Sequence, residues 1–250
     1  MKCLNPFLTH DKLGFIVAVP CGRCLACQSN RRQQWFTRLK FECENYINNC
    51  CFITLTYDDD HLPSDGMLRY SDVQLFWKRL RKELNKPIKY FCCGEYGEHT
   101  FRPHYHAIVF GVDSLALSSV LNEKWDKGFV SLAPVNDARL KYTVKYILKQ
   151  DDFKRSFPNY IKPFIRCSQG LGLSTYLKQE QRYFDLDAFK VDGHYSSFPR
   201  YFKNKSTVFH GHKQPYDEMM SDYDECYDHY SQRLLNFQKK LAKFSKNGVL

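Results

Sequence analysis

One strand organises the fold that we expect from this sequence: Arg102-Pro103-His104-Tyr105-His106-Ala107-Ile108-Val109-Phe110. Its β-branched and aromatic residues favour extended backbone, and side chains of a strand alternate between the two faces of a sheet. His104 and His106 therefore point to the same side. The other side chains continue both faces with apolar groups: Ile108 and Phe110 beside the histidines, and Tyr105, Ala107 and Val109 opposite them. This pattern predicts a central strand that is covered on both faces.

A second strand, residues 88–93, precedes the histidine strand, and a tight connection at 94–101 would join the two as an antiparallel pair. Glu95 would then lie near the strand end, close to the histidines. One carboxylate and two imidazoles make a three-ligand site with open positions, which suits Mg²⁺ or Mn²⁺ with substrate oxygens completing the shell. Glu98 is the alternative third ligand. The competing interpretation makes both glutamates solvated loop residues and the histidines core residues.

A helix is expected over residues 137–150, with Asp137 as its N-cap. At about 100° per residue, its apolar side chains share one face: Leu140, Val144, Ile147 and Leu148. The opposite face carries Tyr142, Lys145, Tyr146 and Lys149. Structural tyrosines normally join the apolar stripe, so this placement indicates a functional role. The alternative is an ordinary amphipathic helix with surface tyrosines.

These residue types fit nucleophilic catalysis on a phosphodiester. A free phenol has a pKa of about 10, so Tyr142 or Tyr146 needs activation before it attacks. A metal ion that polarises the phosphate would provide it, and Lys145 and Lys149 would lower the phenol pKa or stabilise the transition state. A phosphotyrosine bond keeps the energy of the phosphodiester and permits later rejoining, which hydrolysis does not.

These motifs resemble the His-hydrophobe-His (HUH) endonucleases of the rolling-circle replication initiator superfamily, and most of all the initiators of gokushovirus-type phages of the Microviridae. The resemblance covers roughly residues 1–210. It is carried by residues 51–57, by Gly94-Glu95-Tyr96-Gly97-Glu98 with the histidine strand, and by the Tyr-x-x-Lys repeat of residues 142–149. Residues 76–82 and 21–27 also resemble that family. The fold that it implies is α+β, a palm-like central antiparallel sheet with packed helices.

The resemblance also implies a reaction and its partners. The enzyme would nick origin DNA, form a 5′-phosphotyrosine link and leave a free 3′-hydroxyl for a host DNA polymerase, with a host helicase unwinding the duplex. Two tyrosines would attack alternately, and rejoining would release circular single-stranded DNA. By motif position, the metal ligands would be His104, His106 and Glu95. The sequence leaves open which tyrosine attacks first.

Charge favours a polyanionic partner, because 37 Lys and Arg against 27 Asp and Glu give a formal net charge of +10. Basic residues cluster on two expected helices and beside the histidines, and we expect them to contact DNA phosphates: Arg31, Arg32 and Arg38; Lys78, Arg79, Arg81 and Lys82; and Arg102. No apolar run approaches the ~20 residues of a membrane helix.

Eleven cysteines, an odd number, and no amino-terminal signal peptide predict a reducing compartment, the cytoplasm of a bacterial host. Cys21, Cys24 and Cys27 form Cys-x-x-Cys-x-x-Cys, and Cys3 is a possible fourth thiolate. Four thiolates would close a structural Zn²⁺ site, although the spacing also suits an iron–sulfur cluster. The alternative is a set of reduced thiols around a glycine turn.

We expect four segments. Residues 1–47 form a Cys-rich segment with a basic helix at 28–47, and residues 48–150 form the nuclease core. Residues 151–215 form a DNA-binding extension, and residues 216–250 a helical tail. The core would add strands at 51–57 and 129–133, a helix at 71–84 that begins in a Ser71–Gln74 capping box, and a helix at 115–126.

Three classes of function compete. The first is a metal-dependent, tyrosine-using enzyme that nicks and joins DNA, as a phage initiator or as a plasmid initiator, relaxase or transposase of the same superfamily. The second is a non-catalytic nucleic-acid-binding module, which predicts no covalent adduct. The third is a zinc-stabilised structural protein, in which His104 and His106 are core residues.

Overall fold

The computed structural model describes residues 3, 5–11, 13–97, 100–146, 153, 156–180, 188–191 and 194–206. They belong to two compact units, one within residues 1–30 and one within residues 31–210. Helix α1 (Leu25–Glu44) begins in the first unit and continues into the second. Lys149, Glu98 and the expected tail helix at 216–250 lie outside the described residues.

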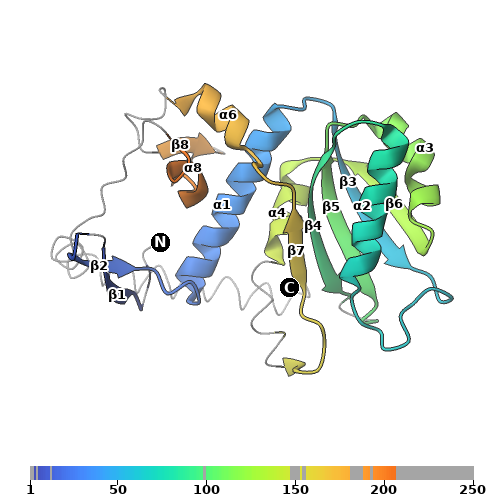
Figure 1. Ribbon diagram of the computed structural model, residues 1–250, viewed down its shortest axis with the longest axis horizontal. Coiled ribbons are helices and arrows are strands. Elements are labelled where there is room, and N and C mark those ends of the chain that lie inside the picture. Colours follow the sequence, from blue (N-terminus) through green and yellow to red (C-terminus); the bar gives the residue numbers. More distant parts are fainter. Residues whose placement is uncertain are drawn as a thin grey trace. The chain divides into compact units, whose positions relative to one another are not determined.

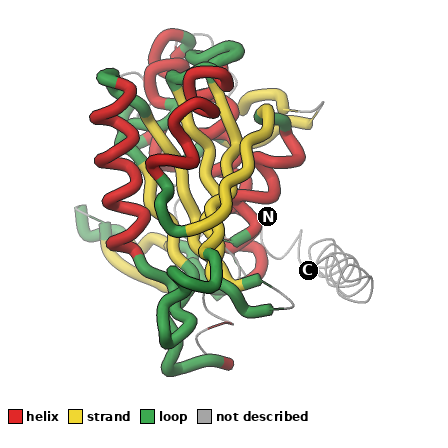
Figure 2. The backbone as a smooth tube through the Cα atoms, turned by 90° about the vertical axis from the view of Figure 1, so that its right-hand side faces the viewer, coloured by secondary structure: helices red, strands yellow, loops and turns green. Residues whose placement is uncertain are grey.

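A five-stranded antiparallel sheet forms the centre of the larger unit. Its strand order is β6-β3-β5-β4-β7, and Figure 2 shows the strands side by side with helices around them. The strand bounds are β3 (Cys50–Tyr57), β4 (Lys89–Tyr96), β5 (Pro103–Phe110), β6 (Gly128–Pro134) and β7 (Phe164–Cys167). The expected α+β fold is confirmed, and the histidine strand β5 holds the central position.

Helices cover both faces of this sheet (Figure 1). Helices α2 (Tyr70–Leu84) and α3 (Ser114–Lys124) pack on the face of Tyr105, Ala107 and Val109. Helices α1 and α4 (Asp137–Lys145) pack on the opposite face, with Ile108 and Phe110. The alternation within β5 therefore separates two apolar cores, and the histidines share a face with α1 and α4.

Strand β4 is longer than expected. It continues to Tyr96 rather than ending at residue 93, and Glu95 pairs across the ladder with His104. The expected connection at 94–101 was therefore wrong, because the cross-strand partners extend the ladder through a glycine. A tight turn follows, in which Gly97 N–H donates to the Arg102 carbonyl and Phe101 adopts a positive φ of 55°.

Several expected helix ends were wrong. Helix α1 ends at Glu44, which leaves Ile47 exposed rather than on its apolar face. Helix α2 begins at Tyr70 without a side-chain cap, so Ser71 and Gln74 form no capping box.

The N-cap of α4 also differs from the expected one. Asn136, not Asp137, accepts the Arg139 N–H, at 2.9 Å. The Asp137 carboxylate instead forms an ion pair with Lys40 on α1, at 3.0 Å. A tertiary partner one residue away therefore selected the cap.

Residues beyond 150 complete this unit. Strand β7 pairs with β4, so part of the expected extension belongs to the central sheet. Helices α6 (Leu173–Lys178) and α8 (Arg200–Lys203) follow, with a hairpin of β8 (Ala188–Val191) and β9 (His194–Ser197) between them. Gly172, with φ 76°, approaches α1 so closely that a Cβ there would lie 2.5 Å from the Arg38 carbonyl oxygen.

Candidate nuclease site

Two adjacent strands bring Glu95, His104 and His106 to one face of the sheet. Glu95 on β4 lies directly opposite His104 on β5, and His106 follows on the same face. His106 Nε2 lies 2.7 Å from Glu95 Oε1, and both residues are only 7% exposed. The structure therefore joins the predicted carboxylate to the histidine pair.

Two threonines of β3 position the imidazole rings. Thr54 Oγ1 lies 3.0 Å from His106 Nδ1, and Thr56 Oγ1 lies 3.0 Å from His104 Nδ1. When each Nδ1–H donates to its threonine, Nε2 keeps the lone pair that a metal ion requires. The sequence analysis did not assign these threonines. Their alternation in Thr54-Leu55-Thr56 was the available signal, but only the strand pairing shows that they face the histidines.

The two tyrosines differ sharply in their surroundings. The Tyr142 hydroxyl lies 3.4 Å from both Glu95 Oε1 and His106 Nε2, and Tyr142 is 39% exposed. Tyr146 is 4% exposed, and its ring stacks on His106 with centroids 5.9 Å apart and an interplanar angle of 12°. The prediction that both tyrosines avoid the packed face was wrong for Tyr146, because the end of α4 lies against the histidine strand.

A second aromatic ring holds His106 in place. Phe52 of β3 stacks on this imidazole with centroids 5.8 Å apart and an interplanar angle of 13°. His106 therefore contacts the rings of both Phe52 and Tyr146. His104 has a tight neighbour of another kind, since a Cβ at Gly97 would lie 2.9 Å from its Nε2. Neither Phe52 nor Gly97 was assigned a role from the sequence.

Burial determines the protonation of these groups. It raises the pKa of Tyr142 to about 12 and also raises the pKa of Tyr146, to which the neighbouring Glu95 contributes. Burial lowers the pKa of His104, and His106 lowers it further. Both phenols are therefore protonated at neutral pH, while His104 is neutral, the form that coordinates metal ions.

Oxygen and imidazole donors on a rigid sheet match the ligand preferences of Mg²⁺ and Mn²⁺. The donor atoms of this site are more widely spread than those of a closed site. In the described part of the chain, Cys3, Cys21, Cys24 and Cys27 are the one group of three or more ligands with donors within 4.8 Å of one another. The histidine site thus has the right donor chemistry in an open arrangement.

The basic residues expected to contact DNA do not form one surface. Helix α1 lies on the histidine face of the sheet and α2 on the other face. The residues with the most exposed side chains are Arg31 on α1 and Lys78, Arg79 and Lys82 on α2, whereas Arg32 and Arg81 are half-buried. Arg79 forms an ion pair with Asp126 at 2.7 Å, and Arg81 donates to the Ile88 carbonyl at 3.4 Å.

Two of the basic residues have structural partners. The Arg38 guanidinium lies 4.0 Å from the Trp35 ring centroid and 3.9 Å from that of Tyr201, and its Nε donates to the Leu171 carbonyl. Arg102 donates to the Tyr57 carbonyl at 2.8 Å and pairs with Asp59. These contacts make Arg38 a packing residue and tie the start of β5 to the end of β3.

An aromatic cluster lies beside the turn that precedes the histidines. It consists of Tyr96, Phe101, Phe153, Phe157 and Tyr160, whose rings contact one another. Phe101, Phe157 and Tyr160 are each more than one-third exposed. Lys145, the last residue of α4, is half-buried.

Comparison with known proteins places this geometry in context. Residues 50–151 match the family model of the replication-associated protein ORF2. The chain is 29% identical over 221 residues to replication-associated protein ORF4 of Chlamydia phage 1, covering 78% of this chain and 55% of that protein. It is 27% identical over 254 residues to replication-associated protein ORF2 of Spiroplasma virus 4, covering 90% and 77%. It is 26% identical over 248 residues to replication-associated protein VP4 of Bdellovibrio phage phiMH2K, covering 89% and 76%.

The chain thus spans just over half the length of the first of these relatives. No solved structure matches it significantly. None of the helices in the described ranges has the length and apolar character needed to cross a membrane. The matched region contains Glu95, His104, His106, Tyr142 and Tyr146. The resemblance read from the motifs is confirmed, and this chain is a relative of the replication-associated proteins of phages that carries the region of the ORF2 family model.

Proposed function

We propose that this protein initiates rolling-circle DNA replication by nicking and rejoining one strand of origin DNA through a tyrosine. The observation that carries the proposal is the placement of the Tyr142 hydroxyl, 3.4 Å from both His106 Nε2 and Glu95 Oε1. A phenol at this distance from metal-type ligands suits attack on a phosphate that the same ligands help to hold. The phage relatives support a replication initiator over a plasmid initiator, relaxase or transposase.

The reaction exchanges one phosphodiester for another. The Tyr142 oxygen attacks the scissile phosphorus and forms the phosphotyrosine bond, while the bond from phosphorus to the 3′ oxygen breaks. The phenol proton passes to Glu95 Oε1, and the departing 3′ oxygen gains a proton to become the primer hydroxyl. No phosphodiester energy is lost to water, so the reverse attack rejoins the strand.

A divalent cation, Mg²⁺ or Mn²⁺, held by His104, His106 and Glu95 would supply charge stabilisation at the phosphate oxygens. Thr54 and Thr56 orient the imidazoles for this role, and Phe52 fixes the plane of His106. Lys145 is the described lysine of the Tyr-x-x-Lys repeat, and we assign it to charge stabilisation at the end of α4.

We propose that Tyr142 attacks first and Tyr146 second. Exposure supports this order, since Tyr142 is 39% exposed and Tyr146 only 4%. The two rings contact each other edge to face at 5.2 Å, so a displacement of Tyr142 after attack changes the packing of Tyr146. Alternate attack would then regenerate the site at the end of each replication round.

The aromatic cluster is our candidate for binding the unpaired strand beside the scissile phosphate. Exposed aromatic rings stack on bases of any sequence, and Phe101 lies in the turn between Gly97 and Arg102, next to His104. Arg31 and the exposed lysines of α2 would add phosphate contacts. Such contacts are independent of sequence and weaken with salt.

The test is cleavage of labelled single-stranded origin DNA with Mn²⁺ or Mg²⁺, read on denaturing gels. Wild type should give a metal-dependent covalent protein–DNA band. Tyr142→Phe should abolish the first cleavage, Tyr146→Phe should leave it and impair joining, and the double variant should form no adduct. Tyr70→Phe is the matched control, because Tyr70 is 38% exposed and lies on α2, against the opposite face of the sheet.

Two outcomes would favour the other classes of function. DNA binding without an adduct in wild type would indicate a non-catalytic nucleic-acid-binding module. An adduct that persists in the double variant would assign the nucleophile elsewhere. Unfolding of His104→Ala and His106→Ala proteins, with neither DNA binding nor cleavage in wild type, would indicate a structural protein.

A further inference from the structure

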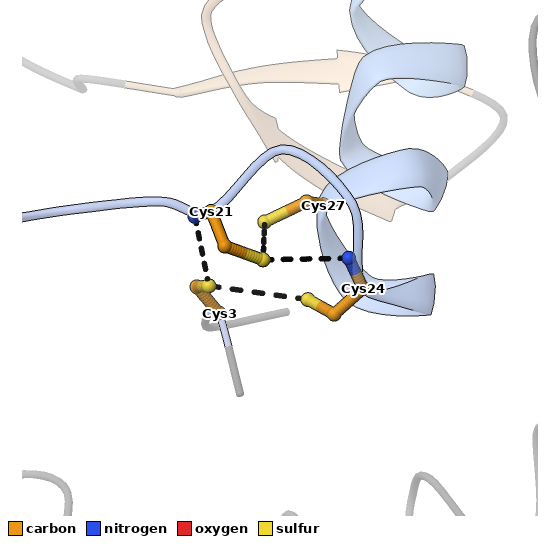
Figure 3. Close-up of side chains that lie close together, drawn as sticks. All are labelled: Cys3, Cys21, Cys24 and Cys27. Carbon is orange, nitrogen blue, oxygen red and sulfur yellow. Dashed lines mark hydrogen bonds between the residues drawn. The ribbon is translucent and has the colours of Figure 1, made fainter. Parts of the chain in front are cut away.

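The first unit contains a cluster of four cysteines that the nuclease chemistry does not use (Figure 3). Cys3 precedes strand β1 (Phe7–His10), and Cys21 follows strand β2 (Ile16–Val19). Cys24 lies just before α1 and Cys27 within its first turn. Three separate segments therefore bring their sulfur atoms together.

The distances among the sulfurs fit one tetrahedral ion. A tetrahedral Zn²⁺ with Zn–S bonds of about 2.3 Å separates its sulfurs by about 3.8 Å. Cys21 Sγ lies 4.0 Å from Cys27 Sγ, Cys24 Sγ lies 3.9 Å from Cys3 Sγ, and all four lie within 4.8 Å of one another. A disulfide requires about 2.05 Å, so no pair is bonded. A cluster with one thiolate per iron would need its sulfurs further apart than a single ion does.

The backbone around the sulfurs supports thiolate ligands. The N–H groups of Arg23 and Cys24 point to Cys21 Sγ at 3.5 and 3.4 Å, and Cys21 N–H points to Cys3 Sγ at 3.2 Å. Such donors stabilise sulfur-bound negative charge and orient ligands around a metal. Gly22 adopts φ 72° between the first two motif cysteines, a conformation that permits the tight turn of Cys21-Gly22-Arg23-Cys24.

The hairpin that these cysteines enclose has little apolar core of its own. Among the described residues up to Asn30, the buried apolar side chains are Val17, Ala26 and Cys27. Five larger apolar side chains there are at least half exposed: Phe7, Leu8, Leu13, Phe15 and Ile16. A two-stranded hairpin is marginal in water, and small units without a core commonly need a metal ion or disulfides.

We propose that Cys3, Cys21, Cys24 and Cys27 bind one structural Zn²⁺ that ties the β1–β2 hairpin to the start of α1. With four protein ligands the site is closed, so the ion has no open position for substrate. Its role is to hold the local fold, because metal binding and folding of such units are coupled. This site is chemically distinct from the oxygen- and imidazole-rich site of the sheet.

The first experiment measures metal content of the full chain purified without added metal. Wild type should carry one zinc per chain, Cys24→Ser should lose it, and Cys167→Ser should keep it. Cys167 is the matched control because it is also a half-buried free cysteine, but lies on β7. His104→Ala should keep the zinc as well, which separates this site from the proposed nuclease site.

A second measurement covers the case in which Cys24→Ser fails to fold. Wild type loaded with Co²⁺ should show the intense visible bands of tetrahedral cobalt and a sulfur-to-cobalt charge-transfer band. Removal of the ion with a chelator should increase protease cleavage within residues 5–24. A folded wild type without stoichiometric metal, zinc retained by Cys24→Ser, zinc lost from His104→Ala, or iron with cluster absorption would each overturn the proposal.

Discussion

The threonines of β3 give the sharpest test of how the nuclease site is built. Thr56→Val keeps the branched shape of the side chain but removes the hydroxyl that lies 3.0 Å from His104 Nδ1. The imidazole would lose the partner that fixes its tautomer and plane. Such partners contribute about 10–100-fold in metal affinity or activity, which is about 1.4–2.8 kcal/mol. The free energy of unfolding should fall by only about 1 kcal/mol, the net worth of one hydrogen bond.

The assay is a titration of Mn²⁺ in the cleavage reaction, with thermal unfolding measured in parallel. Thr54→Val should behave similarly through His106. Thr37→Val is the control, because it also removes a hydroxyl bonded at 3.0 Å, but to the Gln33 carbonyl of its own helix. Unchanged metal dependence and rate in both folded β3 variants would refute the orienting role.

Three further predictions test individual contacts. Gly97→Ala should reduce metal-dependent cleavage roughly 100-fold, because its Cβ would lie 2.9 Å from His104 Nε2 and displace the ring; a fully active, folded variant would contradict this. Arg38→Ala should lower the free energy of unfolding by about 1–3 kcal/mol by losing its ring and carbonyl contacts, whereas Arg31→Ala should reduce the salt dependence of DNA binding by about one ion; the opposite assignment in denaturation and binding experiments would be inconsistent with the structure. Phe157→Ala should weaken single-strand binding by about 1–3 kcal/mol with an unchanged salt dependence, and unaltered affinity would exclude stacking at this ring.

The sequence alone predicted the elements that alternation controls. The two faces of β5, its central position and the shared face of His104 and His106 follow from a period of two residues. The buried positions Leu140 and Val144 follow from helical periodicity in the same way. Glu95 was correctly grouped with the histidines, although the extent of its strand was not, because the ladder continues wherever a neighbouring strand supplies partners.

Tertiary structure decided which groups surround those residues. Thr54, Thr56 and Phe52 reach the histidines through strand pairing between segments about 50 residues apart, and no local pattern encodes that register. The same holds for Arg38, a basic helix residue whose rings and carbonyl partner come from distant segments. Periodicity assigns a side chain to a face, but its partners depend on the register and packing of elements far along the chain. The sequence by itself therefore determined the ligand types and the face they share, and only the folded chain decided how those ligands are oriented and which tyrosine is accessible.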